Sequence, residues 1–294
     1  MGSDMRLVGI ITRLDSPRVQ QVGSEVAAWF GRLGIEARLD SIDPVMDLLV
    51  VLGGDGTLLH VADQASRHDI PVLGINLGNL GFLTEVAEDE MYQALEEVIA
   101  GRGNIEQRMM LKVSLVREEM DPDLEPRFCL NEVAIVKGNV DKVIRLCSWA
   151  DEEYITTYKA DGLIISTPTG STAYNLSAGG PIVHRELHAI LVTPICPFML
   201  ESRPVLLSPG TRITTHLAGP AGDVKVMVDG QFTWEMKMND CLVVEAAAKP
   251  LQLFSSPHKG YFTILRNKLN WGGRYSGFPL PKAAATRFQK NRGD

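Results

Sequence analysis

The sequence of 294 residues contains only four cysteines and no C-x-x-C pair. They lie far apart in the chain, at Cys129, Cys147, Cys196 and Cys241. This spacing argues against the disulfide framework of a small secreted domain and favours reduced thiols in a cytoplasmic protein. We interpret all four as small core residues, the usual role of an isolated cysteine.

Long hydrophobic runs and a basic surface are also missing. The longest apolar stretch, residues 189–200, is too short to cross a bilayer and contains Pro194 and Pro197. No signal peptide is expected at the start of the chain. The formal net charge is −7 at pH 7, which argues against a nucleic-acid surface. We therefore expect neither a membrane nor a nucleic acid among the partners.

Two common nucleotide-binding motifs are absent. The chain has no G-x-G-x-x-G and no G-x-x-x-x-G-K-[ST]. No motif therefore supports a dehydrogenase or a P-loop enzyme. A zinc site is not expected either. His184 and His188 are four residues apart, but Glu186 between them does not give the H-E-x-x-H order, and no third ligand is evident.

What the sequence does have is a short, strongly apolar strand that ends in glycines. Residues 48–52 form a continuous apolar run, which is typical of a strand buried on both faces. Residues 53–57, Gly-Gly-Asp-Gly-Thr, follow; we call them the glycine–aspartate loop. Apolar residues then recur with helical spacing up to Arg67. A glycine turn at a helix N-terminus exposes N–H groups and favours a phosphate.

Asp55 does not fit a simple phosphate cradle. A carboxylate repels a phosphate, so its position in this loop suggests a chemical role. The alternative is that Asp55 only caps the helix. Spacing alone does not separate these two interpretations.

The first third of the chain alternates between strands and helices. The patterns predict strands over 5–12, 35–39, 47–52 and 70–75, and helices over 18–31, 57–67 and 88–101. This alternation predicts an α/β N-terminal domain with a parallel sheet. A ligand should then lie outside the carboxyl ends of the strands, where Asp55 and the loop after Ile75 both lie. In that loop Gly78 and Gly81 permit close backbone approach, and Phe82 is either a stacking surface or a core residue.

After Gly103 the pattern changes to many short β-rich runs. We expect strands over 111–116, 128–136, 146–150, 154–158, 163–166, 205–207, 212–217, 224–228, 232–236 and 241–245. They predict a β-rich, sandwich-like C-terminal domain, with Asp229-Gly230 as a hairpin turn. The predicted domains are residues 1–105 (α/β) and 106–255 (β-rich). Residues 256–294 complete the first domain through a last helix, over 259–269, that returns to it.

Residues 167–174, Thr-Pro-Thr-Gly-Ser-Thr-Ala-Tyr, form the most specific stretch, which we call the hydroxyl-rich turn. It opens a short predicted helix that Gly179-Gly180-Pro181 closes. Hydroxyls and free N–H groups suit phosphate or ribose oxygens, and Tyr174 adds a flat face for stacking. Asn131 and Glu132 enter an otherwise apolar strand and need polar partners, which a ribose diol or ordinary protein groups would supply.

Taken together, these motifs resemble those of the bacterial NAD kinase family. The resemblance rests on the glycine–aspartate loop, residues 76–85, Asn131-Glu132, the hydroxyl-rich turn and Asp229-Gly230-Gln231, and it covers about residues 47–271. The glycine–aspartate loop alone is not specific, because diacylglycerol kinases, sphingosine kinases and phosphofructokinases carry a similar loop. The hydroxyl-rich turn is the discriminating motif.

The resemblance implies a phosphotransferase with an alcohol group as acceptor. It implies transfer of the γ-phosphate of ATP to the 2′-hydroxyl of the adenosine ribose of NAD, which gives NADP. It also implies NAD and ATP as substrates, a divalent cation, usually Mg²⁺, as cofactor, and a homodimer or homotetramer. No metal ligand is assigned, although Asp55 is a candidate. The use of polyphosphate as donor, the use of NADH as acceptor and feedback by NADP(H) stay open.

By motif, the resemblance makes Asp55 the general base that takes the proton from the 2′-hydroxyl. The phosphates are contacted through the backbone of Gly53, Gly54 and Gly56. The nicotinamide-side ribose is held by Asn131 and Glu132. The remaining expected contacts are His60, Lys142, Lys159, Asp161, Thr172, Ala173, Tyr174, Asn175, Leu176, Ser177 and Gln231. Lys142 and Lys159 stand where the family usually has arginine, and Phe198 stands where it often has histidine.

Two other function classes stay open at this point. A lipid or sugar kinase would share the glycine–aspartate loop, but it would not explain the hydroxyl-rich turn or Asn131-Glu132. A non-catalytic NAD-binding protein would need no carboxylate at Asp55. Formation of NADP from NAD, ATP and Mg²⁺ separates all three classes.

Overall fold

The computed structural model of the chain describes residues 5–12, 16–78, 81–117, 124–138, 143–199, 201–219, 222–256 and 259–271. The chain forms two compact units, residues 1–257 and residues 258–294. Lys142, one of the expected NAD contacts, lies outside the described residues.

The first sheet is mostly parallel. Its strands are β1 (Leu7–Thr12), β2 (Glu36–Leu39), β3 (Leu48–Leu52), β4 (Val72–Asn76), β5 (Val86–Ala87), β6 (Asn104–Arg108) and β19 (Leu251–Ser255). Their order is β2-β1-β3-β4-β19-β6, with β5 paired to β4. All pairs are parallel except β6, which runs antiparallel to β19. The predicted α/β domain is therefore confirmed, with one antiparallel edge strand that was not expected.

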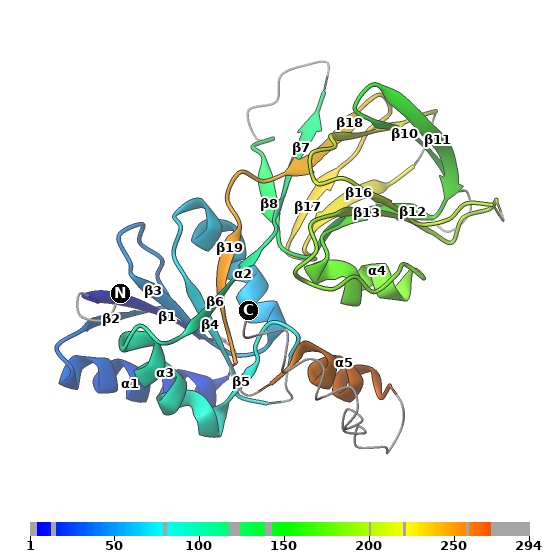
Figure 1. Ribbon diagram of the computed structural model, residues 1–294. Helices are drawn as coiled ribbons and strands as arrows, with labels where there is room; N and C mark the ends of the chain where they lie inside the picture. Colours follow the sequence, from blue (N-terminus) through cyan, green and yellow to red (C-terminus); the bar gives the residue numbers. More distant parts are fainter. Residues whose placement is uncertain are drawn as a thin grey trace, which may run out of the picture. The chain divides into compact units, whose positions relative to one another are not determined.

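Helices cover both faces of this sheet (Figure 1). The apolar stripes of α1 (Pro17–Arg32) and α3 (Met91–Ile99) pack with alternate residues of β1, β3 and β4 into one core cluster. The apolar stripe of α2 (Asp55–Arg67) packs with the other set of alternate residues. Because successive side chains of a strand point to opposite faces, β3 is apolar at every position and fully buried.

Two antiparallel sheets form the β-rich part. Among the described residues each has six strands, in the orders β11-β10-β15-β18-β7-β8 and β14-β13-β12-β9-β16-β17. The first comprises β7 (Leu111–Val116), β8 (Arg127–Cys129), β10 (Ile144–Ala150), β11 (Glu153–Ala160), β15 (Ile213–Leu217) and β18 (Cys241–Ala246). The second comprises β9 (Glu132–Lys137), β12 (Gly162–Ser166), β13 (Ile190–Ile195), β14 (Val205–Leu207), β16 (Val224–Val228) and β17 (Phe232–Glu235). One apolar cluster draws on both sheets, which confirms the predicted sandwich-like fold.

The sheets divide the chain differently from the predicted domain boundaries. The boundary predicted at residue 105 falls inside β6, and β19 lies in the first sheet between β4 and β6. The chain therefore returns to the first sheet as a strand, at Leu251, which is before the predicted return at 256. The last helix, α5 (Tyr261–Leu269), belongs to the second compact unit. Its return to the first domain stays a prediction.

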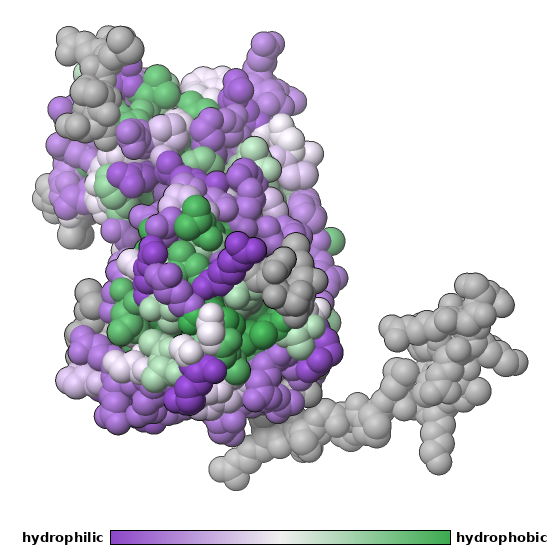
Figure 2. Space-filling model, turned by 90° about the vertical axis from the view of Figure 1, so that its left-hand side faces the viewer, coloured by the Kyte–Doolittle hydropathy of each residue, from purple (hydrophilic) through white to green (hydrophobic). Residues whose placement is uncertain are grey.

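The face shown in Figure 2 is mainly hydrophilic, with separate groups of hydrophobic side chains between the polar ones. Within the described residues, no helix has both the length and the apolar character needed to cross a membrane. The four cysteines are free, and only Cys129 is fully buried, whereas Cys196 is exposed. The expectation that all four are core residues is therefore wrong for Cys196.

Candidate active site

Asp55 is held by backbone amides of a distant loop. It is the first residue of α2 and follows the N-cap residue, Gly54. Asp55 Oδ2 accepts the N–H of Phe82 at 2.8 Å. Oδ1 accepts the N–H groups of Leu83 at 3.0 Å and Thr84 at 3.1 Å, and the Thr84 hydroxyl at 3.0 Å. The capping interpretation is therefore not supported, because these four donors come from the loop after β4.

That loop is shaped around the carboxylate. The Thr84 hydroxyl also accepts the Asn76 side-chain amide at 2.9 Å, and Asn76 Oδ1 accepts the N–H of Gly78 at 2.8 Å. A Cβ placed on Gly81 would lie 1.9 Å from Asp55 Oδ1, so only glycine leaves room for the carboxylate. The predicted close approach at this loop is thus an approach to Asp55.

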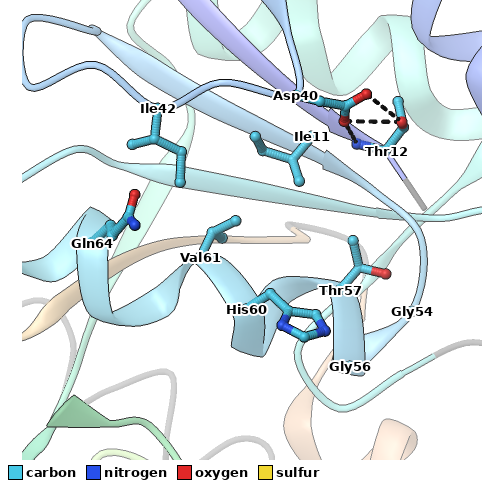
Figure 3. Close-up of a pocket in the computed structure, with 10 residues that line it drawn as sticks. All are labelled: Ile11, Thr12, Asp40, Ile42, Gly54, Gly56, Thr57, His60, Val61 and Gln64. Carbon is cyan, nitrogen blue, oxygen red and sulfur yellow. Dashed lines mark hydrogen bonds between the residues drawn. The ribbon is translucent and has the colours of Figure 1, made fainter. Parts of the chain in front are cut away.

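A cavity of about 740 Å³ lies beside the glycine–aspartate loop, at the carboxyl ends of β1, β2 and β3 (Figure 3). It is lined by Ile11, Thr12, Asp40, Ile42, Gly54, Gly56, Thr57, His60, Val61 and Gln64. Its volume is in the usual range for small-molecule sites. In the order β2-β1-β3-β4, the sheet changes direction between β1 and β3, and ligands of open α/β sheets bind at such a point. The geometry therefore identifies a small-molecule pocket.

The cavity combines an apolar slot with polar ends. Ile11 comes from β1 and Ile42 from the segment after β2, and Val61 faces them from α2 (Figure 3). The exposed N-terminus of α2, at Gly54 and Gly56, adds N–H groups and the positive end of a helix dipole. The slot suits a flat ring and the helix end suits phosphates. His60, one of the expected contacts, lines this cavity, and so does Asp40, which the sequence analysis missed.

Asp40 was missed because its role depends on a neighbouring strand. Its carboxylate accepts the Thr12 N–H at 2.7 Å and the Thr12 hydroxyl at 2.9 Å. These bonds join the carboxyl ends of β1 and β2 and fix one wall of the cavity. A polar residue after a predicted strand was the only available signal.

A second polar centre forms around Asp229. Its buried carboxylate accepts three consecutive amides: Leu130 at 2.7 Å, Asn131 at 2.9 Å and Glu132 at 3.0 Å. These bonds divert the backbone from strand pairing, which explains why the single strand expected over 128–136 is split into β8 and β9. Asp229 and Gly230 have φ of 48° and 66°, and the Gln231 N–H donates to the Val228 carbonyl at 2.9 Å, which closes the hairpin turn between β16 and β17. The predicted turn is confirmed, and its aspartate also organises the Asn131-Glu132 pair.

Glu132 is a buried carboxyl that lacks a full set of partners. It is 9% exposed, and within the described residues its Oε2 is buried without a hydrogen-bond partner. Burial, followed by the charge of Asp229, raises its pKa to about 8, although the Tyr174 N–H opposes this shift. An unsatisfied buried oxygen needs an explanation, and a ligand hydroxyl provides one.

We expect Glu132 to make stability pH-dependent. The native carboxyl keeps its proton up to about pH 8, whereas a carboxyl of ordinary pKa 4.5 ionises much earlier. Between these values the native state binds one proton more than the unfolded state, so the free energy of unfolding falls as pH rises, by up to about 1.4 kcal/mol per pH unit. Glu132→Gln should remove this slope when urea unfolding is compared between about pH 6.5 and pH 7.5, which lies above the pKa of about 6 to which burial raises Asp229.

Glu245→Gln is the matched control. The hydrogen bond from Lys112 lowers the pKa of Glu245, so this carboxyl is ionised in both states across that window. Its loss should leave the slope unchanged. Equal slopes in wild type and Glu132→Gln would show that Glu132 is ionised in the native protein.

The hydroxyl-rich turn uses many of its polar groups internally. The Thr167 hydroxyl donates to the Leu130 carbonyl at 2.5 Å, and the Thr167 N–H donates to the Asn131 carbonyl at 2.9 Å. A Cβ on Gly170 would lie 2.1 Å from the same Asn131 oxygen. The predicted single helix is two short turns, residues 169–172 and 174–177, separated at Ala173. The turn is therefore attached to the Asn131-Glu132 segment.

The other residues of this segment differ in their availability. Asn175 is fully buried, and its side chain bonds Ser171, Pro181 and Thr193. Its side chain therefore acts within the protein, and any ligand contact would use its backbone. The residues that remain at least partly accessible are Thr172, Ala173, Tyr174, Leu176 and Ser177.

Two charged residues among the expected contacts, Lys159 and Asp161, lie on or next to β11. Lys159 is exposed on β11. Asp161 pairs with Lys137 at 2.7 Å, a lysine that the sequence analysis missed because nothing in its local pattern distinguished it from a surface residue. Phe198 is 75% exposed.

A second cavity, of about 560 Å³, is lined by residues of α2 and of the β16–β17 turn. Its lining includes His60 from α2 together with Asp229 and Gln231 from the turn. His60 thus lines both cavities, and Gln231 faces the same space as this histidine. Two expected site regions, around residues 60 and 231, therefore line one cavity, together with Asp229, which accepts the Glu132 N–H. Among the described residues, no group of three or more His, Cys, Asp or Glu side chains could hold a metal ion.

Two domain families match the chain. Residues 35–103 match the family described as ATP-NAD kinase N-terminal domain, and residues 130–256 match the ATP-NAD kinase C-terminal domain. The NAD kinase of Geotalea daltonii is 42% identical over 286 residues, which cover 92% of this chain and 100% of the relative. The NAD kinase of Heliobacterium modesticaldum is 41% identical over 285 residues, which cover 91% and 100%.

Solved structures are similar as well. Yeast NADH kinase complexed with NADH has a TM-score of 0.83 and 25% identity, with 94% of this chain and 90% of that chain covered. An NAD kinase from Archaeoglobus fulgidus in complex with ATP has a TM-score of 0.71 and 26% identity, with 90% and 98% covered.

Proposed function

The chain belongs to the ATP-NAD kinase family, and on this premise we propose that it transfers the γ-phosphate of ATP to the 2′-hydroxyl of the adenosine ribose of NAD, which yields NADP. The observation that carries the proposal is the Asp55 carboxylate, which four hydrogen bonds hold in place. Its neighbours Gly54 and Gly56 line a cavity of a size that suits a small molecule. A protein that only bound NAD would not need this carboxylate.

Asp55 acts as the general base. Oδ1 accepts three hydrogen bonds and Oδ2 accepts one, so Oδ2 keeps a lone pair for a substrate hydroxyl. In phosphoryl transfer, catalysis depends mainly on positioning and charge stabilisation. The four hydrogen bonds that hold the Asp55 carboxylate therefore match the requirement for a positioned proton acceptor.

The donor phosphates bind at Gly54 and Gly56. The N-terminus of α2 supplies unpaired N–H groups there, and His60 lies one helical turn away on the same cavity wall. Mg²⁺ would be held mainly by the phosphates and water, since the described residues offer no cluster of metal ligands. When bound, such an ion neutralises charge on the phosphates.

The acceptor binds at Asn131, Glu132 and the hydroxyl-rich turn. The Oε2 of Glu132, which has no hydrogen-bond partner among the described residues, suits a ribose hydroxyl. Tyr174, which is 36% exposed, offers a ring for stacking. Asp229 and Thr167 engage the backbone of Asn131, so a contact between Asn131 and the ligand would use its side-chain amide.

The substrate NAD itself tests the proposal. We expect NADP from NAD, ATP and Mg²⁺, and no turnover of diacylglycerol, sphingoid bases or fructose 6-phosphate. NAD that lacks the 2′-hydroxyl should bind but not react. Phosphorylation of the 2′-deoxy analogue would mean that another oxygen is the nucleophile, and turnover of a lipid or sugar alone would favour the alternative kinase classes.

Asn131→Ala should raise the apparent KM for NAD far more than the KM for ATP. The expected loss is about 1–3 kcal/mol, because a polar partner of the ribose is left unpaired. Steady-state kinetics with each substrate varied in turn measures it. An equal effect on both substrates, or a loss of folding, would assign Asn131 a structural role.

The cytoplasmic location and the homodimer or homotetramer implied by the family stay predictions. Sedimentation of the purified protein measures the second.

A further inference from the structure

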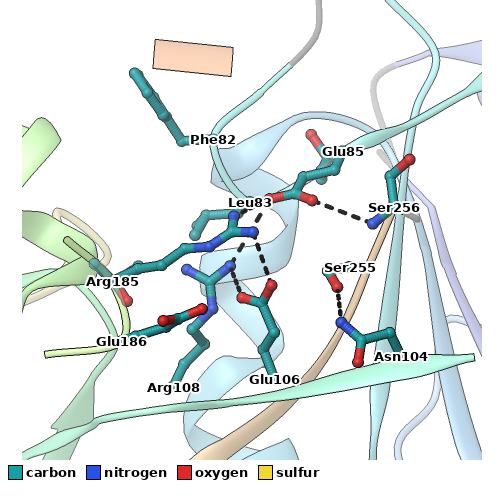
Figure 4. Close-up of polar contacts among 12 residues, drawn as sticks. Phe82, Leu83, Glu85, Asn104, Glu106, Arg108, Arg185, Glu186, Ser255 and Ser256 are labelled. Atoms are coloured by element: carbon teal, nitrogen blue, oxygen red, sulfur yellow. Dashed lines mark hydrogen bonds and ion pairs between the residues drawn. The ribbon is translucent and has the colours of Figure 1, made fainter. Parts of the chain in front are cut away.

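Four charged side chains form a cluster beside residues 82–84, the loop that bonds Asp55 (Figure 4). They are Glu85, Glu106, Arg108 and Arg185. Arg185 lies in the segment that follows the hydroxyl-rich turn, and its guanidinium donates hydrogen bonds to two carboxylates, an arrangement that we call the fork. Nη1 donates to Glu85 Oε1, and Nη2 donates to Glu106 Oε1 at 2.7 Å. Arg108 completes the cluster, with its Nη2 2.8 Å from Glu106 Oε2. Two positive and two negative groups thus balance each other.

The cluster is almost closed to solvent. The exposed fractions of the side chains are 1% for Glu85, 3% for Arg108, 10% for Arg185 and 18% for Glu106. Burial, followed by the charge of Arg185, lowers the pKa of Arg108. Charges in such surroundings hold fixed positions, because a displaced partner would leave a buried charge unpaired.

Arg185 links the loop that bonds Asp55 to the segment that follows the hydroxyl-rich turn. Glu85 directly follows Thr84, whose N–H and hydroxyl both donate to Asp55. On the other side, the Val183 N–H donates to the Ser171 hydroxyl at 3.0 Å, and the Pro181 carbonyl accepts the Asn175 amide at 3.1 Å. The segment that carries Arg185 is thus bonded to the hydroxyl-rich turn, and its guanidinium is bonded to the loop that seats Asp55.

We propose that Arg185 is a positioning residue, which sets the distance between the NAD-binding turn and the Asp55 carboxylate through its fork on Glu85 and Glu106. The inference rests on the proposed function. Arg185 does not touch the reacting atoms. Its loss should therefore disturb the alignment of nucleophile and base more than the binding of either substrate, since small misplacements lower the rate strongly.

Arg185→Met tests this, because it keeps an unbranched apolar stem and removes the guanidinium group. We expect kcat to fall roughly 10- to 100-fold, while the Kd for NAD alone and for ATP alone changes less than about threefold. Arg185→Lys keeps the charge without the fork and should give an intermediate kcat. Arg212→Met is the control, since it removes an exposed ion pair with Glu245 and should leave kcat unchanged.

A second variant covers the case in which Arg185→Met fails to fold. Arg185→Met with Glu106→Gln leaves Arg108 and Glu85 as a balanced pair, so no net charge is buried. This double variant should fold and show the same loss of kcat. A folded double variant with normal kcat would overturn the proposal, as would an equal loss of substrate affinity.

Hydrogen exchange separates this proposal from the proposed function, since it needs no turnover. Arg185→Met should speed amide exchange at least about fivefold in peptides covering 81–91 and 171–183, and Arg212→Met should not. Unchanged exchange in both peptides, or faster exchange throughout the chain, would overturn the positioning role. If wild type forms no NADP but the exchange result holds, the proposed function fails and the structural link stands.

Discussion

Asp55→Asn should lower kcat for NAD phosphorylation by about two powers of ten or more, with the fold intact. The amide cannot accept the proton of the 2′-hydroxyl, and a placed base contributes about 10²–10⁴ in rate. One amide N–H would also face a backbone donor where the carboxylate now accepts Phe82 or Leu83, so some local stability is lost. Initial rates at saturating NAD and ATP, together with thermal unfolding, measure both effects.

Asp47→Asn is the matched control. Asp47 precedes β3 at the end opposite to Asp55, and its Oδ2 also accepts two backbone amides, those of Arg6 at 2.8 Å and Leu7 at 3.0 Å. This substitution should affect stability but not kcat. Near-normal turnover by Asp55→Asn would remove the general base from the mechanism, and the carboxylate would then have only a structural role.

Gly81→Ala should lower kcat by about tenfold or more without unfolding the protein. The new Cβ would lie 1.9 Å from Asp55 Oδ1 and 2.5 Å from the Thr84 hydroxyl, so the carboxylate must move. Gly81 does not have a positive φ, so alanine causes no backbone strain there. The substitution therefore displaces Asp55 and leaves its chemistry unchanged. Measurement of kcat and of the Kd for each substrate separates displacement from lost binding.

A double variant shows whether Gly81 acts through Asp55. Because both changes would disable the same group, Asp55→Asn with Gly81→Ala should be no slower than Asp55→Asn alone. Gly31→Ala is the control for adding a methyl group, since nothing lies within 4 Å of a Cβ there. Additive losses in the double variant would mean that Gly81 affects turnover by another route.

The sequence predicted the elements that depend on local patterns. The apolar run of β3, the amphipathic spacing of α2 and the Asp-Gly turn between β16 and β17 all appear as expected. Their structure follows from periodicity and backbone preference, which short segments carry by themselves. The motifs likewise indicated the family, and the comparisons confirmed it.

Contacts between distant segments were not predictable in the same way. Asp55 bonds residues 27 to 29 positions later, and this pairing decided that it does not cap its helix. β19 joins the first sheet next to β4, although about 175 residues separate them in the chain. No local signal distinguishes such a strand from those of the neighbouring sandwich.

The sequence by itself therefore determined the family, the two fold classes and the residue types of the site. Only the tertiary structure decided which polar groups are already used within the protein and which remain for a ligand. The side chain of Asn175 is saturated, whereas Glu132 keeps a buried oxygen without a partner among the described residues. The reason is physical: a hydrogen bond or ion pair, such as Arg185 with Glu85 across 100 residues, depends on where the chain brings two groups together.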